Sequence, residues 1–303
     1  VIGNEDNRSV AMPEGKIIKA LSGFYYVIDE GRTIQCRGRG VFRKRNVTPL
    51  VGDTVVYQYE NEQEGYILEV KDRKNELVRP PISNVDQAIL VFSAIEPAFS
   101  TLLLDRFLTI IEENDIDAVI VITKVDLLSE SDKEKINEFK RDYEQIGYPV
   151  ILASSETSEG ISQLRPLLKD AVSVFAGQSG VGKSSLLNAL VPDLELKTAG
   201  ISSHLGRGKH TTRHVELIPV ENGLVADTPG FSSLDFTMDE ADLPFCFPEM
   251  REKAQDCKFR GCMHLQEPKC AVKAAVETGD IQQYRYDHYL EFLTEIKDRK
   301  PRY

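Results

Sequence analysis

Short runs of alternating apolar and polar residues fill the first part of the chain, and turn signals separate them. Five such runs lie between residues 15 and 70, and none of them shows the period of a long helix. Evenly spaced short strands without helices are typical of a small closed barrel. The predicted strands span residues 15–21, 23–28, 33–37, 51–59 and 65–70.

The pattern changes after Arg79-Pro80-Pro81, which we interpret as a linker. Near-continuous apolar runs now alternate with stretches of helical period, and such runs are typical of strands buried on both faces of a parallel sheet. The alternation predicts an α/β domain with a doubly wound parallel sheet. Strands are predicted at 86–92, 118–122 and 150–153, and helices at 102–114 and 132–146.

A glycine-rich stretch, Gly177-Gln178-Ser179-Gly180-Val181-Gly182-Lys183-Ser184, matches the phosphate-loop pattern G-x-x-x-x-G-K-[ST]. An apolar run at 172–176 precedes it, and a helical stretch beginning at Ser185 follows. The glycines allow backbone N–H groups to turn inward around a phosphate, and the helix N-terminus adds positive potential. We expect Lys183 to reach the β- and γ-phosphates and the Ser184 hydroxyl to bind magnesium. The alternative, a glycine-rich turn without a ligand, leaves the filled pattern unexplained.

A second motif, Thr123-Lys124-Val125-Asp126, ends the second predicted strand of the sheet. GTPases place [NT]-K-x-D at this point to recognise guanine. The Asp126 carboxylate can accept hydrogen bonds from the ring N–H and the exocyclic amine of guanine, and adenine offers neither on that edge. The aliphatic part of Lys124 can cover the base plane. Ser154, after the third strand, is expected to lie in the turn that touches the base carbonyl.

Two switch segments are expected downstream of the phosphate loop. Residues 200–213 are rich in glycine and charge, and we favour Thr212 over Thr211 as a second magnesium ligand. Asp227-Thr228-Pro229-Gly230 then follows an apolar strand, so Asp227 is expected behind the magnesium water shell and the Gly230 N–H near the γ-phosphate.

The residue after Gly230 is Phe231, at the position where many GTPases carry a glutamine that orients water. Phenylalanine cannot do this, so another group must act on the attacking water. Our catalytic candidates are His210 for that role and Lys183. The alternative for His210 is an exposed histidine that contacts a partner.

Three cysteines and one histidine lie within fourteen residues, spaced as Cys257-x4-Cys262-x-His264-x5-Cys270. Zn²⁺ prefers four such ligands in a tetrahedral array. The segment has little apolar content, so a metal is expected to replace its core; the alternative is a set of unrelated free cysteines. Cys36 and Cys246 are expected to pack as small apolar residues. Helices are predicted at 270–277 and 281–299.

Composition and charge limit the compartments and the binding partners that the sequence predicts. No apolar run approaches the roughly 20 residues of a membrane span, and no signal peptide opens the chain, so we expect a soluble cytoplasmic protein. Residues 1–11 are set aside as a cloning remnant or a disordered tail.

The net charge of −11 argues against bulk attraction to nucleic acid but permits a local basic patch. Such a patch, which includes a potential stacking ring at Phe42, is an RNA contact or a solvated hairpin; its members are Arg37, Arg39, Arg43, Lys44 and Arg45.

The order of the motifs is permuted, because the guanine motif precedes the phosphate loop and both switches follow it. With the barrel and the Cys/His segment, this combination resembles the bacterial ribosome small subunit-dependent GTPase A family, over nearly everything from Met12 onward. The resemblance implies an OB-fold barrel, GTP hydrolysis stimulated by the small ribosomal subunit, and a role in late subunit maturation in the cytoplasm. It also favours rRNA contact for the basic patch and the catalytic role for His210.

We therefore predict a multidomain protein: an OB-fold barrel at 12–72, a circularly permuted GTPase domain at 82–236, and a mostly helical zinc-binding domain at 237–303. The expected partners are the small ribosomal subunit with its rRNA and GTP or GDP, and the expected state is a monomer. One structural Zn²⁺ and a Mg²⁺ bound with GTP are the expected metals. The rival function is a nucleotide-regulated RNA-binding module with incidental hydrolysis. A P-loop kinase or ATPase is disfavoured by Asp126.

Overall fold

The structure is a computed structural model that describes residues 12–38, 42, 47–78, 80–191, 215–227 and 234–299. The chain divides into two compact units. The first contains the described residues up to Asn84 together with 215–218, and the second contains 85–191 and the described residues from 219 onward. In this part of the chain, no helix has the length and apolar character needed to cross a membrane.

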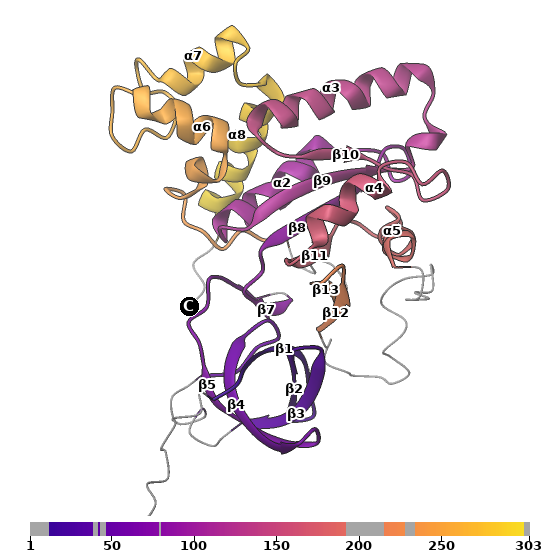
Figure 1. The fold of residues 1–303 in the computed structure, drawn as a ribbon. Coiled ribbons are helices and arrows are strands. Elements are labelled where there is room, and N and C mark those ends of the chain that lie inside the picture. Colours follow the sequence, from indigo (N-terminus) through magenta and orange to yellow (C-terminus); the bar gives the residue numbers. More distant parts are fainter. Residues whose placement is uncertain are drawn as a thin grey trace, which may run out of the picture. The chain divides into compact units, whose positions relative to one another are not determined.

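The first unit is a closed five-stranded barrel, as predicted (Figure 1). The ring closes because β1 pairs with both β2 and β4, β2 pairs with β3, and β5 pairs with both β3 and β4. All these pairings are antiparallel except that of β3 with β5. The strands are β1 (Glu14–Leu21), β2 (Phe24–Asp29), β3 (Arg32–Gly38), β4 (Thr54–Asn61) and β5 (Glu64–Val70).

Alternate residues of these strands fill the barrel interior, which explains the period of two in the sequence. Ile17, Val27 and Ile67 have no exposed surface. Cys36 is also fully buried, and burial raises the pKa of its thiol to about 11. The expectation that Cys36 packs as an apolar residue is thus confirmed.

The segment expected to be a linker is instead a hairpin, β6 (Glu76–Val78) and β7 (Pro81–Ser83). The buried carboxylate of Asp53 holds it in place. It accepts hydrogen bonds from Arg73 Nε at 2.7 Å, Arg73 Nη2 at 2.8 Å and Ser83 Oγ at 2.6 Å. The linker prediction was wrong because a proline pair was interpreted as a break, although proline is tolerated at the first residue of a strand.

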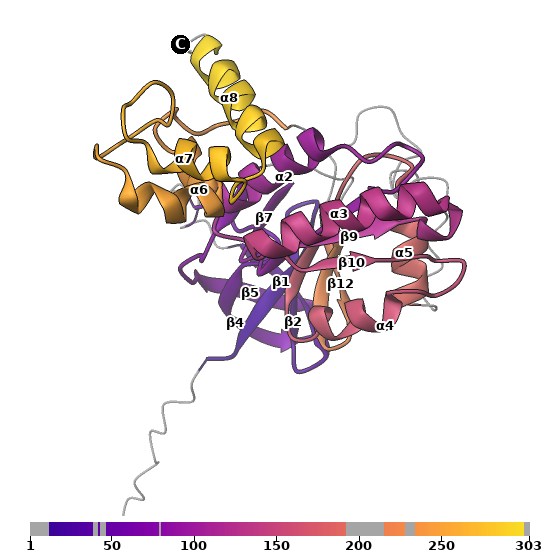
Figure 2. The same cartoon turned by 90° about the horizontal axis from the view of Figure 1, so that it is seen from above.

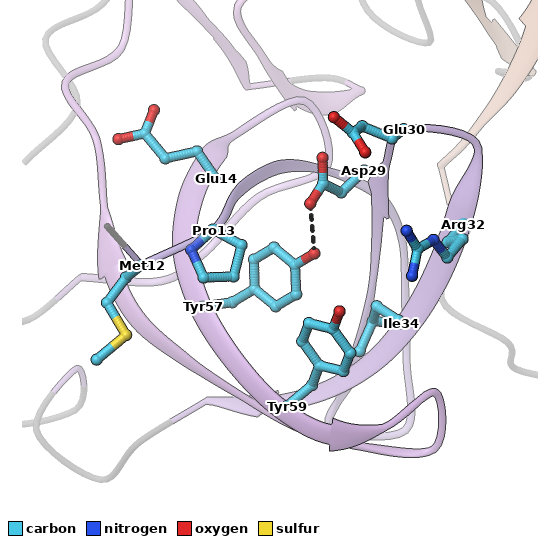
Figure 3. A pocket seen from close by; sticks show the side chains of 9 residues that line it. All are labelled: Met12, Pro13, Glu14, Asp29, Glu30, Arg32, Ile34, Tyr57 and Tyr59. Carbon is cyan, nitrogen blue, oxygen red and sulfur yellow. Dashed lines mark hydrogen bonds between the residues drawn. The ribbon is translucent and has the colours of Figure 1, made fainter. Parts of the chain in front are cut away.

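One end of the barrel is hollowed into a cavity of about 400 Å³. Tyr57 and Tyr59 stack in its wall with ring centroids 5.7 Å apart, and the Tyr57 hydroxyl donates to Asp29 Oδ2 at 2.8 Å (Figure 3). Glu14, Asp29 and Glu30 give the lining an excess of carboxylates over its one guanidinium, that of Arg32. The residues that line the cavity include none of the predicted site residues.

The second unit contains the predicted parallel sheet, with strand order β10-β9-β8-β11-β13. This confirms the α/β prediction. The strands are β8 (Gln87–Ser93), β9 (Asp117–Thr123), β10 (Val150–Leu152), β11 (Val172–Ala176) and β13 (Gly223–Asp227). The strand that precedes β13 in the chain, β12 (Glu216–Val220), begins in the first unit and ends in the second.

Helices cover both faces of this sheet (Figures 1 and 2). On one face, Ile89 and Val91 of β8 pack in a core with Leu186 of α5. On the other, the Phe92 ring meets Phe107 of α2 edge-on with centroids 5.7 Å apart. The helices are α2 (Thr101–Glu113), α3 (Glu130–Ile146), α4 (Ile161–Leu164) and α5 (Lys183–Leu190), with 3-10 turns η1 (Val125–Leu127) and η2 (Arg165–Leu168).

Local signals explain where α2 and α3 begin and where α3 ends. Ser100 caps α2 by accepting the Leu103 N–H at 3.3 Å, and Ser129 caps α3 by accepting the Asp132 N–H at 3.3 Å. Gly147 ends α3 in the left-handed conformation, with φ of 115°.

The C-terminal region is helical and has a hydrophobic core of its own. Phe247, Tyr289 and Phe292 are fully buried there, and Ile110 of α2 joins the same cluster. The expectation that a metal replaces the core was therefore wrong, because it considered only the cysteine-rich stretch and not the helices on either side. Cys246 is buried as expected, and burial raises its pKa to about 12. The elements are η5 (Leu243–Cys246), α6 (Pro248–Lys253), η6 (Ala254–Asp256), α7 (Ala271–Thr278) and α8 (Gln283–Asp298).

A buried group of charges joins this region to the sheet's helices. Asp105 of α2 and Arg285 of α8 are almost fully buried, and Arg285 Nη1 donates to Asp105 Oδ1 at 2.6 Å. Tyr143 of α3 donates to the same oxygen at 2.6 Å, and His288 Nδ1 lies 2.6 Å from Asp105 Oδ2. Arg285 also donates to both carboxylate oxygens of Glu249 in α6, at 2.7 and 3.0 Å. We call these five residues the Asp105 node.

We predict that Arg285→Met will lower the free energy of unfolding of the second unit by about 3 kcal/mol or more, because two carboxylates would stay buried without their cation. Urea unfolding measures this. Arg165→Met is the matched control, since the pair of Arg165 with Glu221 is about 40% exposed on each side and should contribute less than about 1 kcal/mol. Equal losses in the two variants would contradict the prediction.

Candidate functional site

The predicted nucleotide motifs meet at one edge of the sheet. Parallel strands bring their carboxyl ends to the same edge, and β9, β8 and β11 are neighbours in that order. Thr123 is the last residue of β9 and pairs with Ser93 at the end of β8, while Ala176 of β11 pairs with Leu90. The guanine motif and the phosphate loop, more than fifty residues apart in the chain, therefore begin close together.

The phosphate loop has the required strand–loop–helix context, because β11 ends at Ala176 and α5 begins at Lys183. Gly177 has φ of 146°, and a Cβ there would lie 2.0 Å from the Val91 carbonyl oxygen, so only glycine fits. Gly182 precedes α5 with φ of 94° and supplies no side chain to cap the helix. The N–H groups of the first turn therefore have no side-chain cap from this position, which suits an anion ligand.

Lys183 folds back onto its own loop. Its Nζ donates to the Gly177 carbonyl oxygen at 2.7 Å and to that of Gln178 at 2.5 Å. Burial lowers the pKa of this amine, since a desolvated ammonium is disfavoured. A phosphate in the loop would supply the missing opposite charge. Ser184, the second residue of α5, is buried beside it.

Two side chains of the guanine motif contact the phosphate loop directly. The buried Thr123 Oγ1 lies 2.5 Å from the Val181 carbonyl oxygen and 3.1 Å from that of Phe92, and its single proton favours the shorter contact. Lys124 has a left-handed backbone, and its Nζ donates to the Gly180 carbonyl oxygen at 2.9 Å. Asp126 lies in η1 with its side chain exposed. The motif thus contacts the phosphate loop through Thr123 and Lys124, while the Asp126 side chain is exposed.

Ser154 shapes the turn after β10. Its hydroxyl is fully buried and accepts the N–H groups of Glu156 and Thr157, each at 3.2 Å. Contact of this turn with a base stays a prediction.

Several predicted site residues lie outside the described part of the chain. These are His210, Thr212, Gly230, Arg39, Arg43, Lys44 and Arg45. Asp227 ends β13, but its side chain is not described. Of the basic patch, Arg37 is exposed at the end of β3, with its guanidinium 5.0 Å from the Phe24 ring centroid.

The four predicted metal ligands come together. Their ligand atoms all lie within 4.8 Å of one another, and only Cys257 is partly exposed. His264 Nδ1 is 3.3 Å from Cys270 Sγ and 3.8 Å from Cys257 Sγ, and the two sulfurs are 3.9 Å apart. A tetrahedron with metal–sulfur bonds of about 2.3 Å has edges of about 3.8 Å, so this donor set fits a metal ion.

Electrostatics support the same fit. Burial raises the pKa of Cys262 to about 12 and lowers that of His264, so this pocket favours uncharged ligands until a cation enters. Nδ1 of His264 faces the sulfurs. The other ring nitrogen, Nε2, is buried and has no hydrogen-bond partner among the described residues.

Residues that the sequence did not single out hold the loop at 263–265, which carries the ligand His264. The Glu267 carboxylate accepts the N–H groups of Met263 and Leu265 at 2.8 and 2.7 Å. Tyr286 donates to the His264 carbonyl oxygen at 2.6 Å, and Tyr289 donates to that of Met263 at 2.7 Å. No sequence signal marks such contacts, because a side chain bonded to a distant backbone group needs no fixed spacing.

Comparison with known proteins agrees with this geometry. The family model described as RsgA GTPase matches residues 70–237, and that of the RsgA N-terminal domain matches 14–67. The chain is 65% identical over 298 residues to "Small ribosomal subunit biogenesis GTPase RsgA" of Bacillus subtilis (strain 168), covering 96% of this chain and 100% of the relative. A relative of the same name from Geobacillus kaustophilus (strain HTA426) is 64% identical over 293 residues, with the same coverage.

Two solved structures are similar over nearly the whole chain. One is entitled "The crystal structure of YloQ, a circularly permuted GTPase", with a TM-score of 0.84 and 57% identity, covering 99% of this chain and 100% of that one. The other is YjeQ from Thermotoga maritima, with a TM-score of 0.85 and 39% identity, covering 95% and 99%.

We predict that the purified protein binds about one metal ion per chain and that Cys262→Ala loses most of it, because a tetrahedral site needs all four ligands. A chelator should lower the Tm of the wild type by about 5 °C or more and leave Cys262→Ala nearly unchanged. Atomic emission and thermal unfolding measure both quantities. Cys246→Ala is the control, since this buried cysteine lies outside the cluster; metal loss in that variant as well would contradict the assignment.

Proposed function

The chain belongs to the RsgA GTPase family, and from that membership we propose that its GTP hydrolysis serves the biogenesis of the small ribosomal subunit. The observation that supports GTP as the nucleotide is the contact between the two motifs. Thr123 and Lys124 hold the phosphate loop by its own carbonyl groups, and this supports a guanine-reading role for the exposed Asp126 of the same motif.

In this proposal the phosphate loop, from Gly177 to Ser185, surrounds the phosphates with N–H groups, and Lys183 neutralises the β- and γ-oxygens. Water attacks the γ-phosphorus while the bond to the leaving GDP breaks, and His210 orients that water, since Phe231 cannot. Ser184 and Thr212 would be the protein ligands of Mg²⁺, which would neutralise phosphate charge when bound.

Further residues have proposed roles around the nucleotide, at the Cys/His cluster and in the basic patch. Asp227 would support a Mg²⁺ ion through its bound water, the Gly230 N–H would sense the γ-phosphate, and Ser154 would border the base. Zn²⁺ is the structural ion of the Cys/His cluster. The basic patch that starts at Arg37 contacts rRNA, and the protein acts as a cytoplasmic monomer. The boundaries 12–72, 82–236 and 237–303 stay our domain predictions.

The test of this function is GTP hydrolysis by the full chain with and without purified small ribosomal subunits. We expect turnover to rise tenfold or more, which is a fall of about 1.4 kcal/mol in the barrier. Large subunits at the same concentration are the control. A rate unchanged by small subunits would remove the proposed role. Completed subunit maturation by a GTP-loaded but inactive variant would favour the nucleotide-regulated RNA-binding module.

We predict that the side chain at position 126 decides which base the protein binds. Asp126→Asn should weaken GTP binding by about 100-fold, because two hydrogen bonds to a charged acceptor are lost at about 1.5 kcal/mol or more each. The same variant should gain affinity for XTP, since the amide can donate to the carbonyl that replaces the guanine amine. Titration with fluorescent GTP and XTP measures both. Asp115→Asn, an exposed aspartate of the loop before β9, should change neither.

A further inference from the structure

A buried serine organises the loop that follows β8, the strand between the guanine motif and the phosphate loop. Ser93 ends β8 with 2% of its surface exposed, and its hydroxyl oxygen accepts the N–H groups of Ile95 at 3.4 Å and Glu96 at 3.0 Å. The Ala94 N–H donates to the Thr123 carbonyl oxygen at 2.9 Å, which continues the pairing of β8 with β9. A serine hydroxyl that binds N–H groups two and three residues further on fixes a tight turn.

The far end of this loop is anchored by aromatic contacts. The half-buried Phe99 ring meets Phe92 of β8 with centroids 6.1 Å apart and Phe139 of α3 with centroids 5.4 Å apart. Ser100 follows directly and caps α2. Residues 94–99, which we call loop 94–99, are thus held at both ends by side chains of the second unit.

The middle of loop 94–99 contacts the guanine motif through a backbone carbonyl group. The Glu96 carbonyl oxygen accepts a hydrogen bond from Lys124 Nζ, which also donates to the Gly180 carbonyl oxygen of the phosphate loop at 2.9 Å. Among the described residues no carboxylate pairs with Lys124, so carbonyl groups of two different loops hold its ammonium. Hydrogen bonds from a charged donor are strong ones, and they fix the far end of a side chain that has many rotamers in solvent.

We propose that Ser93 is a positioning residue for guanine-nucleotide binding. Its hydroxyl fixes the turn that places the Glu96 carbonyl group, and this carbonyl group holds Lys124 in the conformation in which its aliphatic stem covers the base. The role given to Lys124 here rests on the proposed function of the guanine motif. Ordering this long side chain before the nucleotide arrives removes an entropy cost from binding. Ser93 acts only through Lys124 and does not touch the nucleotide.

Removal of the Ser93 hydroxyl leaves two N–H groups of the turn without their acceptor, and the Glu96 carbonyl group then loses its fixed place. A purely structural role for Ser93 would lower stability in the same way, but its effect on nucleotide affinity would not depend on Lys124. The two roles therefore differ in whether the effects of substituting Ser93 and Lys124 are coupled.

A double-mutant cycle on the affinity of the full chain for fluorescent GDP, which is not hydrolysed during the titration, tests this coupling. Ser93→Ala should bind about 5-fold more weakly than the wild type, since the lysine must now be ordered on binding. Lys124→Met keeps the aliphatic stem and loses the ammonium. Ser93→Ala added to Lys124→Met should weaken binding by less than about twofold, because the contact that Ser93 supports is already absent. Equal losses in the two backgrounds, or unchanged affinity of Ser93→Ala itself, overturn the proposal.

Ser173→Ala is the matched control. Ser173 of β11 is fully buried, and its hydroxyl accepts from Gln87 Nε2 at 2.9 Å at the beginnings of the two strands, away from the edge that carries the nucleotide motifs. This variant should lower the Tm much as Ser93→Ala does and leave the GDP affinity unchanged, because both lose a buried acceptor. An equal loss of affinity in Ser173→Ala would overturn the proposal.

Two further variants separate the hydroxyl and the carbonyl group from other features. Ser93→Thr retains the hydroxyl and should bind GDP nearly as well as the wild type; weak binding by this variant with its Tm retained contradicts the proposed role. Glu96→Gln should also bind as the wild type does, because only the backbone carbonyl group of Glu96 holds Lys124. A loss in Glu96→Gln as large as that in Ser93→Ala would assign the effect to the carboxylate and overturn the proposal.

The Tm of every variant shows whether it is folded, and a second variant replaces Ser93→Ala if that protein does not fold. Phe99→Leu loosens the other end of loop 94–99. It should weaken GDP binding when Lys124 is present and by less than about twofold in Lys124→Met. Equal losses in the two backgrounds again overturn the proposal.

The outcomes separate this proposal from the wider function. Stimulation of hydrolysis by small subunits, together with equal losses in the two backgrounds, would refute the role of Ser93 and keep the ribosomal role. A loss that disappears in Lys124→Met, without any stimulation by subunits, would do the reverse.

Discussion

The nucleotide site depends on the parallel pairing of β9, β8 and β11. This pairing brings the end of β9 to the phosphate loop, where Thr123 and Lys124 hold the carbonyl groups of Val181 and Gly180. The order of the motifs along the chain is irrelevant to this contact, because only the order of the strands in the sheet decides which ends are neighbours. A permuted chain can therefore build the same site as an unpermuted one.

The Asp105 node extends that arrangement to the C-terminal region. The loop between β8 and α2 supplies the Glu96 carbonyl oxygen that accepts from Lys124 Nζ, and α2 then carries Asp105. Arg285 and Glu249 fix α8 and α6 to the same helix through buried charges, which are costly to separate. The C-terminal region thus packs on α2, the helix that follows the loop contacted by Lys124, in addition to following residues 227–230 in the chain.

Regular features were predictable from the sequence, and long-range polar contacts were not. Continuous apolar runs gave the strands β8, β9 and β11, and the fixed spacing of Cys257, Cys262, His264 and Cys270 gave the metal cluster. The hairpin of β6 and β7 was missed because it depends on Asp53, a carboxylate twenty residues from Arg73 and thirty from Ser83. Asp105 and Arg285 are 180 residues apart and share no motif, so only the folded chain reveals their pairing.

The metal cluster illustrates how local and long-range order combine. Spacing alone suggested a small segment that a metal would hold together in place of a core. The structure instead sets Cys262 and Cys270 at the border of a core that contains Phe247 and Phe292. The core fixes the helices, so a metal ion held by the four ligands would need to order only the short loops between them. Side chains on such short loops need not enter the core, and Phe259, between Cys257 and Cys262, is accordingly 43% exposed although the helices around it have a buried core.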